Sequence, residues 1–224
     1  MIDYTPIILS LKLAFVVTII LFVISIPISY WLTYSKFRLK AIAEVAITLP
    51  LVLPPSVLGF YLLLAFSPGN SFGKFLEQYF NIRLVFTFEG LVIASVLYSL
   101  PFMINPVLSG FRSLPPSLKE ASFTLGKSRL TTLTKILLPN IRVSLFTGIV
   151  MTFAHTLGEF GVVLMVGGSI PKQTRVVSIA IYDEVESMNY HDANIYSAIL
   201  LLFAFLILLV VYRVKQRKAF NLLG

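Results

Sequence analysis

Cysteine is absent from the 224 residues. Its absence excludes disulfides, Cys-ligated zinc, iron–sulfur clusters and thiol nucleophiles. Charged side chains are scarce as well: they make up 12% of the chain, whereas hydrophobic residues make up 57%. An ordinary soluble domain carries about a quarter charged residues. The composition therefore predicts an all-α integral membrane protein.

Acidic residues are outnumbered by basic ones, and the formal net charge is +8. A nucleic-acid-binding protein would place such an excess in a basic patch interleaved with aromatic residues, and the sequence shows no such patch. The tendency of cytoplasmic loops to carry Lys and Arg explains the charge instead. We therefore expect a lipid bilayer as partner and no nucleic acid.

Long hydrophobic runs are abundant, and crossing a bilayer core takes about 20 residues. The N-terminal run lacks a basic flank and a small-residue cleavage site, so we expect it to be retained. The chain is predicted to form one transmembrane domain over residues 1–224, with five spans at 8–34, 41–66, 85–111, 136–165 and 193–212.

The charges predict how these spans are oriented. If the crossings alternate, the Lys and Arg residues of segments 36–40, 112–142 and 213–218 share one side. The positive-inside rule makes that side cytoplasmic, with the N-terminus outside and the C-terminus inside. The segment 112–139 is then a cytoplasmic loop and 166–192 an external loop. The external side receives Asp3, Glu77, Glu89, Asp183, Glu184, Glu186 and Asp192.

The cytoplasmic loop contains a predicted short helix. Ser117 and Glu120 have the spacing of a capping box. In this motif the serine hydroxyl accepts a hydrogen bond from a free amide of the first helical turn, and the glutamate carboxylate accepts one from the amide of the cap residue. Gly126 is expected to end the helix, and Lys127 to hold it at the membrane surface. Small or apolar residues recur at helical spacing and form a face that suits a groove on a partner: Leu118, Ala121, Ser122 and Leu125.

Two predicted spans contain more than one proline. The second span has three prolines, Pro50, Pro54 and Pro55, within Leu49–Ser56, so its helix must be kinked or broken. A packing kink and a wall of a polar pathway are both compatible with this pattern. In the third span Asn105 lies between two prolines, and either a bond to another helix or a place in the pathway suits an intramembrane Asn.

The fourth span contains the polar residues Thr152, His155, Thr156 and Glu159. Ionisable groups within a membrane are costly and commonly functional. A continuous helix would place Glu159 about 30 Å from Asn140, near the outer interface. His155 and Glu159, one turn apart, could pair or bind a metal; a capped polar patch where the helix leaves the membrane is the alternative. An intramembrane enzyme would need a nucleophile or further ligands at this depth.

One apparent motif is incomplete. Gly126-Lys127-Ser128 has the ending of a phosphate-binding loop, but Ala121 stands where that loop requires glycine, and no strand precedes it. We therefore expect no ATP site of this kind.

The cytoplasmic loop resembles the coupling loop of ABC importer permeases. Its pattern is Glu120-Ala121-Ser122, then Gly126 after three residues, then 136–139, Ile-Leu-Leu-Pro, after nine more. Ser122 departs from the family's third alanine. The segments 49–56, LPLVLPPS, and 156–162, TLGEFGV, are similar to those of molybdate permeases, and the likeness covers nearly the whole chain. Sulfate, thiosulfate and tungstate permeases share much of it.

This resemblance implies the type I ABC importer permease fold and a homodimeric, non-enzymatic subunit in the cytoplasmic (inner) membrane. The partners would be two ATP-binding cassette subunits, which hold ATP and Mg, and an external oxyanion-binding protein; no cofactor or metal is expected on this chain. The expected cargo is molybdate, with sulfate, thiosulfate or tungstate as alternatives, and a passive channel would not explain the cytoplasmic helix. The ATPase-coupling residues would be Ser117, Leu118, Glu120, Ala121, Ser122, Leu125, Gly126 and Lys127. The candidate residues of the pathway or its gate are Pro54, Ser56, Asn105, Thr152, Thr156 and Glu159. An ionised Glu159 would repel an oxyanion, so a structural or gate-supporting role is expected for it.

Overall fold

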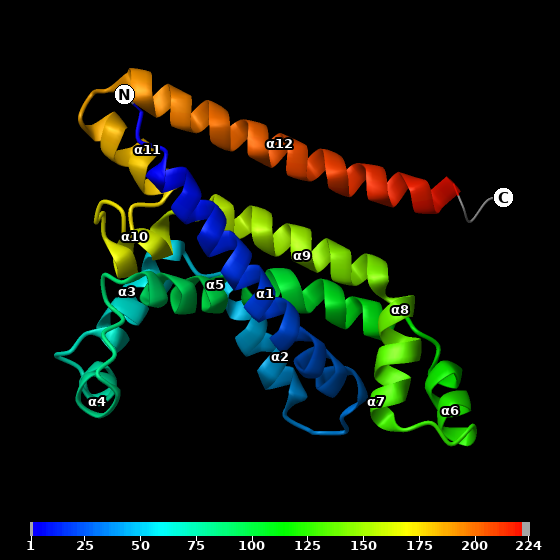
Figure 1. Ribbon diagram of the computed structural model, residues 1–224. Coiled ribbons are helices and arrows are strands. Elements are labelled where there is room, and N and C mark those ends of the chain that lie inside the picture. The colour runs from blue at the N-terminus through cyan, green and yellow to red at the C-terminus, as the bar shows by residue number, and fades with distance from the viewer. Residues whose placement is uncertain (1, 221–224) are drawn as a thin grey trace.

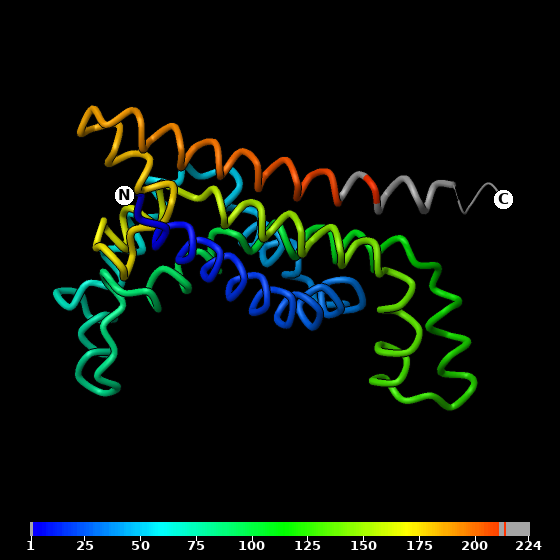
Figure 2. The backbone as a smooth tube through the Cα atoms, turned by 45° about the horizontal axis from the view of Figure 1, so that its top comes forward, coloured from blue at the N-terminus to red at the C-terminus, as the bar shows by residue number. Residues whose placement is uncertain are grey.

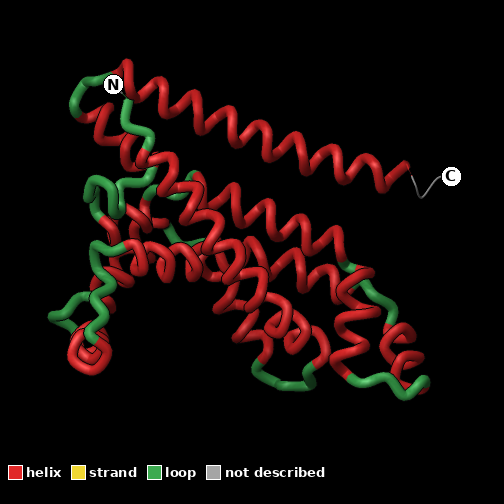
Figure 3. Tube along the Cα trace, viewed as in Figure 1, coloured by secondary structure: helices red, strands yellow, loops and turns green. Residues whose placement is uncertain are grey.

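Helices make up the architecture of residues 2–220, the part of the chain that the computed structural model describes, and no β-strand occurs among them (Figures 1 and 3). The bundle is built on α1 (Thr5–Tyr34), α5 (Phe88–Arg112) and α9 (Arg142–Leu157), each of which packs against the other two. The long helix α12 (Tyr190–Phe220) runs beside α9 and stands apart from the rest for most of its length (Figure 1).

Three helices are long and apolar enough to cross a membrane unbroken: α1, α5 and Tyr190–Val210 of α12. They coincide with the predicted first, third and fifth spans. Two helix pairs qualify only when each is taken as one bent span, Lys40–Leu51 with Pro55–Phe66 and Arg129–Asn140 with Arg142–Leu157. The described residues thus allow up to five spans, and the count of five and the sidedness stay predictions.

Prolines break the second span, as predicted. Helix α2 (Lys40–Thr48) tightens into the 3-10 turn η1 (Leu49–Leu51), and α3 (Pro55–Phe66) then departs at 109°. Pro54 adopts an extended backbone because a residue before proline is excluded from the helical region. Pro55 occupies the first helical position, where its missing N–H costs nothing.

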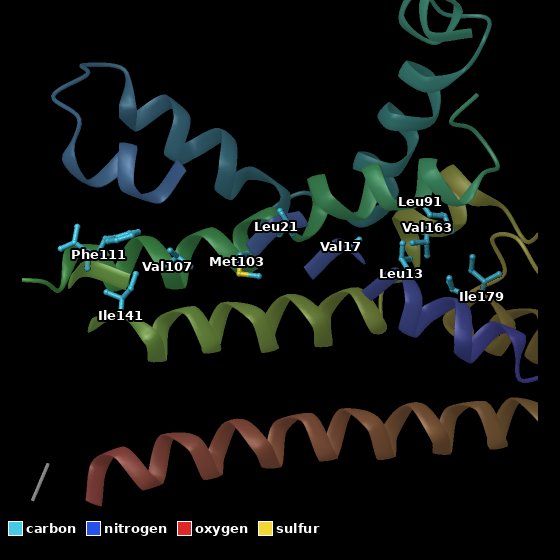
Figure 4. Close-up of a cluster of buried hydrophobic side chains, with 12 residues drawn as sticks. Leu13, Val17, Leu21, Leu91, Met103, Val107, Phe111, Ile141, Val163 and Ile179 are labelled. Atoms are coloured by element: carbon cyan, nitrogen blue, oxygen red, sulfur yellow. The ribbon is translucent and has the colours of Figure 1, made fainter. Parts of the chain in front are cut away.

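The central core lies where α1, α5 and α9 meet (Figure 4). Small residues let the backbones approach: a Cβ on Gly148 of α9 would lie 2.9 Å from the Met103 sulfur of α5. Close packing of this kind drives helix association in lipid, where burying apolar surface yields no gain. Buried members of this core are Leu13, Val17, Leu21, Leu91, Met103, Val107, Phe111, Leu137, Ile141, Val163, Val176 and Ile179.

One end of the bundle, here the α11 end, carries α4 (Ser71–Phe80), α10 (Gly161–Gly167) and α11 (Val177–Glu186). The N-terminal region is bonded there to α11 and to the start of α12. The Val177 amide donates to Ser10 Oγ at 2.8 Å, and the Tyr196 hydroxyl donates to the Asp3 carbonyl oxygen at 2.7 Å. Arg175 of the α10–α11 link donates to carboxylates on α11; burial acts to lower its pKa, but bonds to Glu184 and Asp183 outweigh that effect and raise it.

The opposite end, the α6 end, carries α6 (Pro116–Thr124), α7 (Arg129–Thr132), the π-helical turn η2 (Leu133–Leu137) and α8 (Leu138–Asn140) (Figure 2). The loop between α1 and α2 lies at the same end. The structure therefore gathers at one end the basic residues that the sequence predicted to share a side of the membrane, among them Lys36, Arg38, Lys119, Lys127, Arg129 and Lys135.

Candidate functional site

Helix α6 starts earlier than the sequence predicted, and the capping box is wrong. Its N-cap is Pro115, and no side chain caps the helix. Pro116 forces Pro115 into an extended conformation and itself takes the first helical position. Ser117 therefore lies inside the helix rather than at its cap, and Ser117 and Glu120 are both exposed.

The end of α6 is as predicted. Gly126 has a φ of +70°, a conformation that side chains disfavour. Its amide donates to the Phe123 carbonyl at 2.9 Å, and the Lys127 amide donates to the Ser122 carbonyl at 3.1 Å. These two bonds form a Schellman motif, which satisfies carbonyls at the helix end. Gly126 is thus required by the backbone and not by crowding, since nothing lies within 4 Å of a Cβ there.

The predicted docking face of α6 is divided between the chain itself and solvent. Ser122 is 2% exposed, and its Oγ lies 2.8 Å from Thr132 Oγ1 of α7. Leu118 is half-buried, whereas Ala121 is exposed and Leu125 is 75% exposed. Ser122 therefore holds α6 against α7. The side chains left free, which we call the α6 surface, are Ser117, Glu120, Ala121, Leu125, Lys127 and Leu130.

Lys119 ties α6 to the bundle, a contact that the sequence analysis missed. Its Nζ lies 4.0 Å from the centroid of the Tyr34 ring, a cation–π arrangement. Burial, and secondarily Arg129, lowers the pKa of this amine. A cavity of about 530 Å³ beneath α6 is lined by Lys119, by Tyr34, and by Phe111 and Arg112 of α5. The available signal was an aromatic pair one turn apart, Tyr30 and Tyr34, at the end of α1.

Asn105 lies in a cavity of its own, away from the other candidate pathway residues. This cavity of about 290 Å³ is lined by side chains of α1, α2 and α5, including Asn105, Thr48 and Ser109. Arg112 of α5 and Glu44 of α2 form an ion pair in its wall. Because Arg112 also lines the cavity beneath α6, the two cavities share this residue.

The predicted fourth span is interrupted at the polar cluster. Helix α9 ends at Leu157, and α10 begins at Gly161. The continuous helix predicted through Glu159 is therefore wrong, because this residue lies in the short link between α9 and α10; its place near the outer interface stays a prediction. A cavity of about 470 Å³ beside this link is lined by Ser56 of α3, Tyr98 of α5, His155 and Glu159. We call it the link cavity; its remaining lining residues are Pro55, Gly158, Phe160 and Gly161.

The structure brings only some candidate pathway residues together. Ser56 and Glu159 line the link cavity, and Pro54 immediately precedes the helix that supplies Ser56. Thr156 is buried between α9 and α5, with its Oγ1 2.9 Å from Ser99 Oγ. Thr152 is also fully buried, without a partner for its hydroxyl.

Glu159 is the least satisfied polar residue of the cluster. It is 4% exposed, and neither carboxyl oxygen has a hydrogen-bond partner. A pair with His155 does not form: the imidazole packs 3.8 Å from the Phe102 ring and 4.9 Å from the Tyr98 ring, between centroids. Among the described residues no three His, Asp or Glu side chains converge as metal ligands.

Glycine lets α3 and α10 approach at the link cavity. A Cβ on Gly161 would lie 2.7 Å from the Pro55 Cβ, and one on Gly59 would lie 2.9 Å from the Met165 Cβ. These distances are shorter than van der Waals contact. The absence of a side chain at Gly161 therefore lets the start of α10 pack directly against the start of α3, and Gly161 and Pro55 both form part of the cavity wall.

Comparison with known proteins agrees with this architecture. The chain is 42% identical over 218 residues to the molybdenum transport system permease protein ModB of Azotobacter vinelandii, covering 97% of this chain and 96% of that protein. It is 30% identical over 215 residues to the sulfate transport system permease protein CysT of Salmonella typhimurium, covering 96% and 77%.

A solved structure described as inward facing conformations of the MetNI methionine ABC transporter shares the fold, with a TM-score of 0.71, 18% identity and coverage of 95% of this chain and 94% of that one. The family described as "Binding-protein-dependent transport system inner membrane component" matches residues 25–217. The chain therefore belongs to the family of inner membrane components of binding-protein-dependent transport systems.

Proposed function

We propose that this chain is the permease subunit of an ABC importer for molybdate, a tetrahedral oxyanion, in the cytoplasmic membrane. The observation that carries the proposal is the 42% identity to a molybdenum transport permease over nearly all of both chains. The relative described as a sulfate permease, at 30% identity, makes sulfate the alternative cargo. Substrate choice rests largely with the external binding protein.

The α6 surface would dock in a groove of an ATP-binding cassette subunit. The cytoplasmic side would then be the α6 end, with the N-terminus outside and the C-terminus inside, in agreement with the basic residues gathered there. ATP and Mg would belong to the two partner subunits. Movement of α6 would reach α9 through the Ser122–Thr132 contact and α1 through Lys119 and Tyr34.

A second copy of the chain would complete the pathway. Irregular backbone is tolerated at membrane depth only where protein or a water-filled cavity covers it. The η1–α3 break and the α9–α10 link meet at the link cavity, so their shared side suits a pathway at a twofold axis better than it suits lipid. Closure of the ATPases would open this side outward, and hydrolysis would return it.

Transport of an oxyanion needs weak, transient donors rather than a fixed cation, because tight binding would prevent release. Ser56 at the link cavity and Asn105 near the α6 end would supply such donors in succession. Thr152 and Thr156 would support the packing of α9 rather than touch the anion, since both are buried and Thr156 contacts Ser99 of α5.

The test is uptake by liposomes that contain the permease, its ATPase and the binding protein. We expect ATP-dependent accumulation of labelled molybdate, competition by tungstate, and weaker competition by sulfate. Competition by sulfate alone would contradict the molybdate assignment. Gly126→Val should abolish uptake and binding-protein-stimulated ATP hydrolysis, because Val is strained at a φ of +70°, and normal coupling in this variant would contradict the role of α6.

A further inference from the structure

The carboxyl group of Glu159, in the link between α9 and α10, is buried without the partners that a negative charge needs. An ionised carboxylate transferred from water to a low-dielectric interior needs a cation or several hydrogen-bond donors, and without them the group takes up a proton. Both Glu159 oxygens are buried without a partner. The ion pairs formed by described residues leave Glu159 unpaired: they join Arg83 to Glu77, Arg112 to Glu44, and Arg175 to Asp183 and Glu184.

No Lys, Arg, Asp or other Glu lines the link cavity among the described residues, and His155 is the base in its lining. From α5, Tyr98 is titratable and lines the cavity, and Ser95 brings a buried hydroxyl near the carboxyl group without reaching hydrogen-bond geometry. From α9, His155 packs between aromatic rings. Helix α3 supplies Ser56 and Pro55, which do not titrate. From α11, Ser178 donates to the Glu159 backbone carbonyl, and Tyr182 packs against Phe160.

Because Glu159 lies in a non-helical link, its side chain is not fixed by the hydrogen bonds of a helix. The residue lies between two helices, and it lines the link cavity although its carboxyl oxygens are sealed behind the wall. The start of α3 lines the same cavity and lies against α10 where Gly161 meets Pro55. A rearrangement of the link that turned the carboxyl group into the cavity would bring it to the same space as Ser56.

We propose that the link cavity is an oxyanion-binding site in which Glu159, carried as a neutral carboxylic acid, donates a hydrogen bond to the anion. The inference rests on the proposed function for the class of ligand. The acid O–H donates to one anion oxygen, and the Ser56 hydroxyl donates to another. The proton stays on Glu159 throughout, so no bond is exchanged and no co-reactant is needed.

The same group makes the site sensitive to protonation. Loss of the proton turns the donor into a negative charge that repels the anion at hydrogen-bond distance. Uptake should therefore fall as the pH rises. A glutamine in this position keeps an N–H donor and cannot ionise, whereas a leucine keeps the volume and provides no donor.

The first experiment measures protonation without transport. Infrared difference spectra of the assembled transporter in liposomes at neutral pH should contain the carbonyl band of a protonated carboxylic acid. The band should be absent from Glu159→Gln and retained in Glu89→Gln, which alters an exposed carboxylate in the first turn of α5. A wild-type spectrum without this band, or a band that Glu159→Gln leaves in place, would overturn the neutral acid.

The second experiment measures molybdate uptake against pH in the same liposomes. Glu159→Leu should lower uptake about tenfold or more, the effect of removing one hydrogen bond to a charged group. Glu159→Gln should restore much of that loss and flatten the alkaline decline. Equal loss in both variants, or wild-type uptake in Glu159→Leu, would overturn the site. If the wild-type transporter imports no molybdate at any pH, the proposed function fails, and the infrared band still decides the state of Glu159.

Discussion

Ser122 of α6 and Thr132 of α7 meet through their hydroxyl oxygens, 2.8 Å apart and shielded from solvent. This contact leaves no room for a larger side chain on the inner face of α6. The proposed docking of α6 to an ATPase would require a fixed angle between α6 and the bundle. The Ser122–Thr132 contact sets that angle against the helix that leads into α9.

We predict that Ser122→Leu displaces α6 and strongly reduces uptake, whereas Ser122→Ala costs only the hydrogen bond, about 1 kcal/mol. Binding-protein-stimulated ATP hydrolysis and molybdate uptake in liposomes measure the coupling. Thr124→Leu is the control, because Thr124 lies on the same helix and is exposed. Wild-type coupling in Ser122→Leu would show that the packing of α6 against α7 does not matter for transport.

The Glu44–Arg112 ion pair links the broken second span to the end of α5. Its side chains are 29% and 46% exposed, respectively, so its contribution to stability should be small, about 0–1 kcal/mol. We predict that Glu44→Arg and Arg112→Glu each reduce uptake by placing like charges in contact, and that the double exchange restores part of it. An exchange variant no better than the two single variants would exclude the ion pair as the reason.

Gly161 should be intolerant of any side chain. An added Cβ would lie 2.7 Å from the Pro55 Cβ, so Gly161→Ala must separate α3 from α10, at a cost of about 1–3 kcal/mol for overpacking. Thermal unfolding of the purified protein in detergent measures this loss. Gly158→Ala is the matched control, because its nearest contact would be the Ala154 carbonyl at 3.9 Å. Equal melting temperatures for the two variants would contradict the crowding at Gly161.

Local rules predicted the features that depend on local chemistry. Pro54 and Pro55 predicted the break in the second span because proline acts on its own backbone and the preceding residue. Gly126 predicted the end of α6 in the same way. The capping box failed where two local signals competed, since Pro115 and Pro116 start the helix before Ser117.

Tertiary packing decided what the sequence did not reveal. Ser122 appeared suited to a partner's groove, but its neighbour is Thr132 of the same chain. Glu159 was placed by helical rise, whereas the chain leaves the helix at Leu157 so that Gly161 can reach Pro55. Both outcomes depend on contacts between segments that no periodicity or spacing connects.

The bonds that join Ser10 to Val177 and Asp3 to Tyr196 also constrain the biosynthesis of the protein. They connect residues 167 and 193 positions apart, so the first cannot form until the ribosome has made the start of α11, and the second not until it has made the start of α12. Contacts this distant in sequence form late and cost the most chain entropy. Ser10 of the first helix therefore has no Val177 partner until α11 is made, and the bond from Asp3 follows with the start of α12.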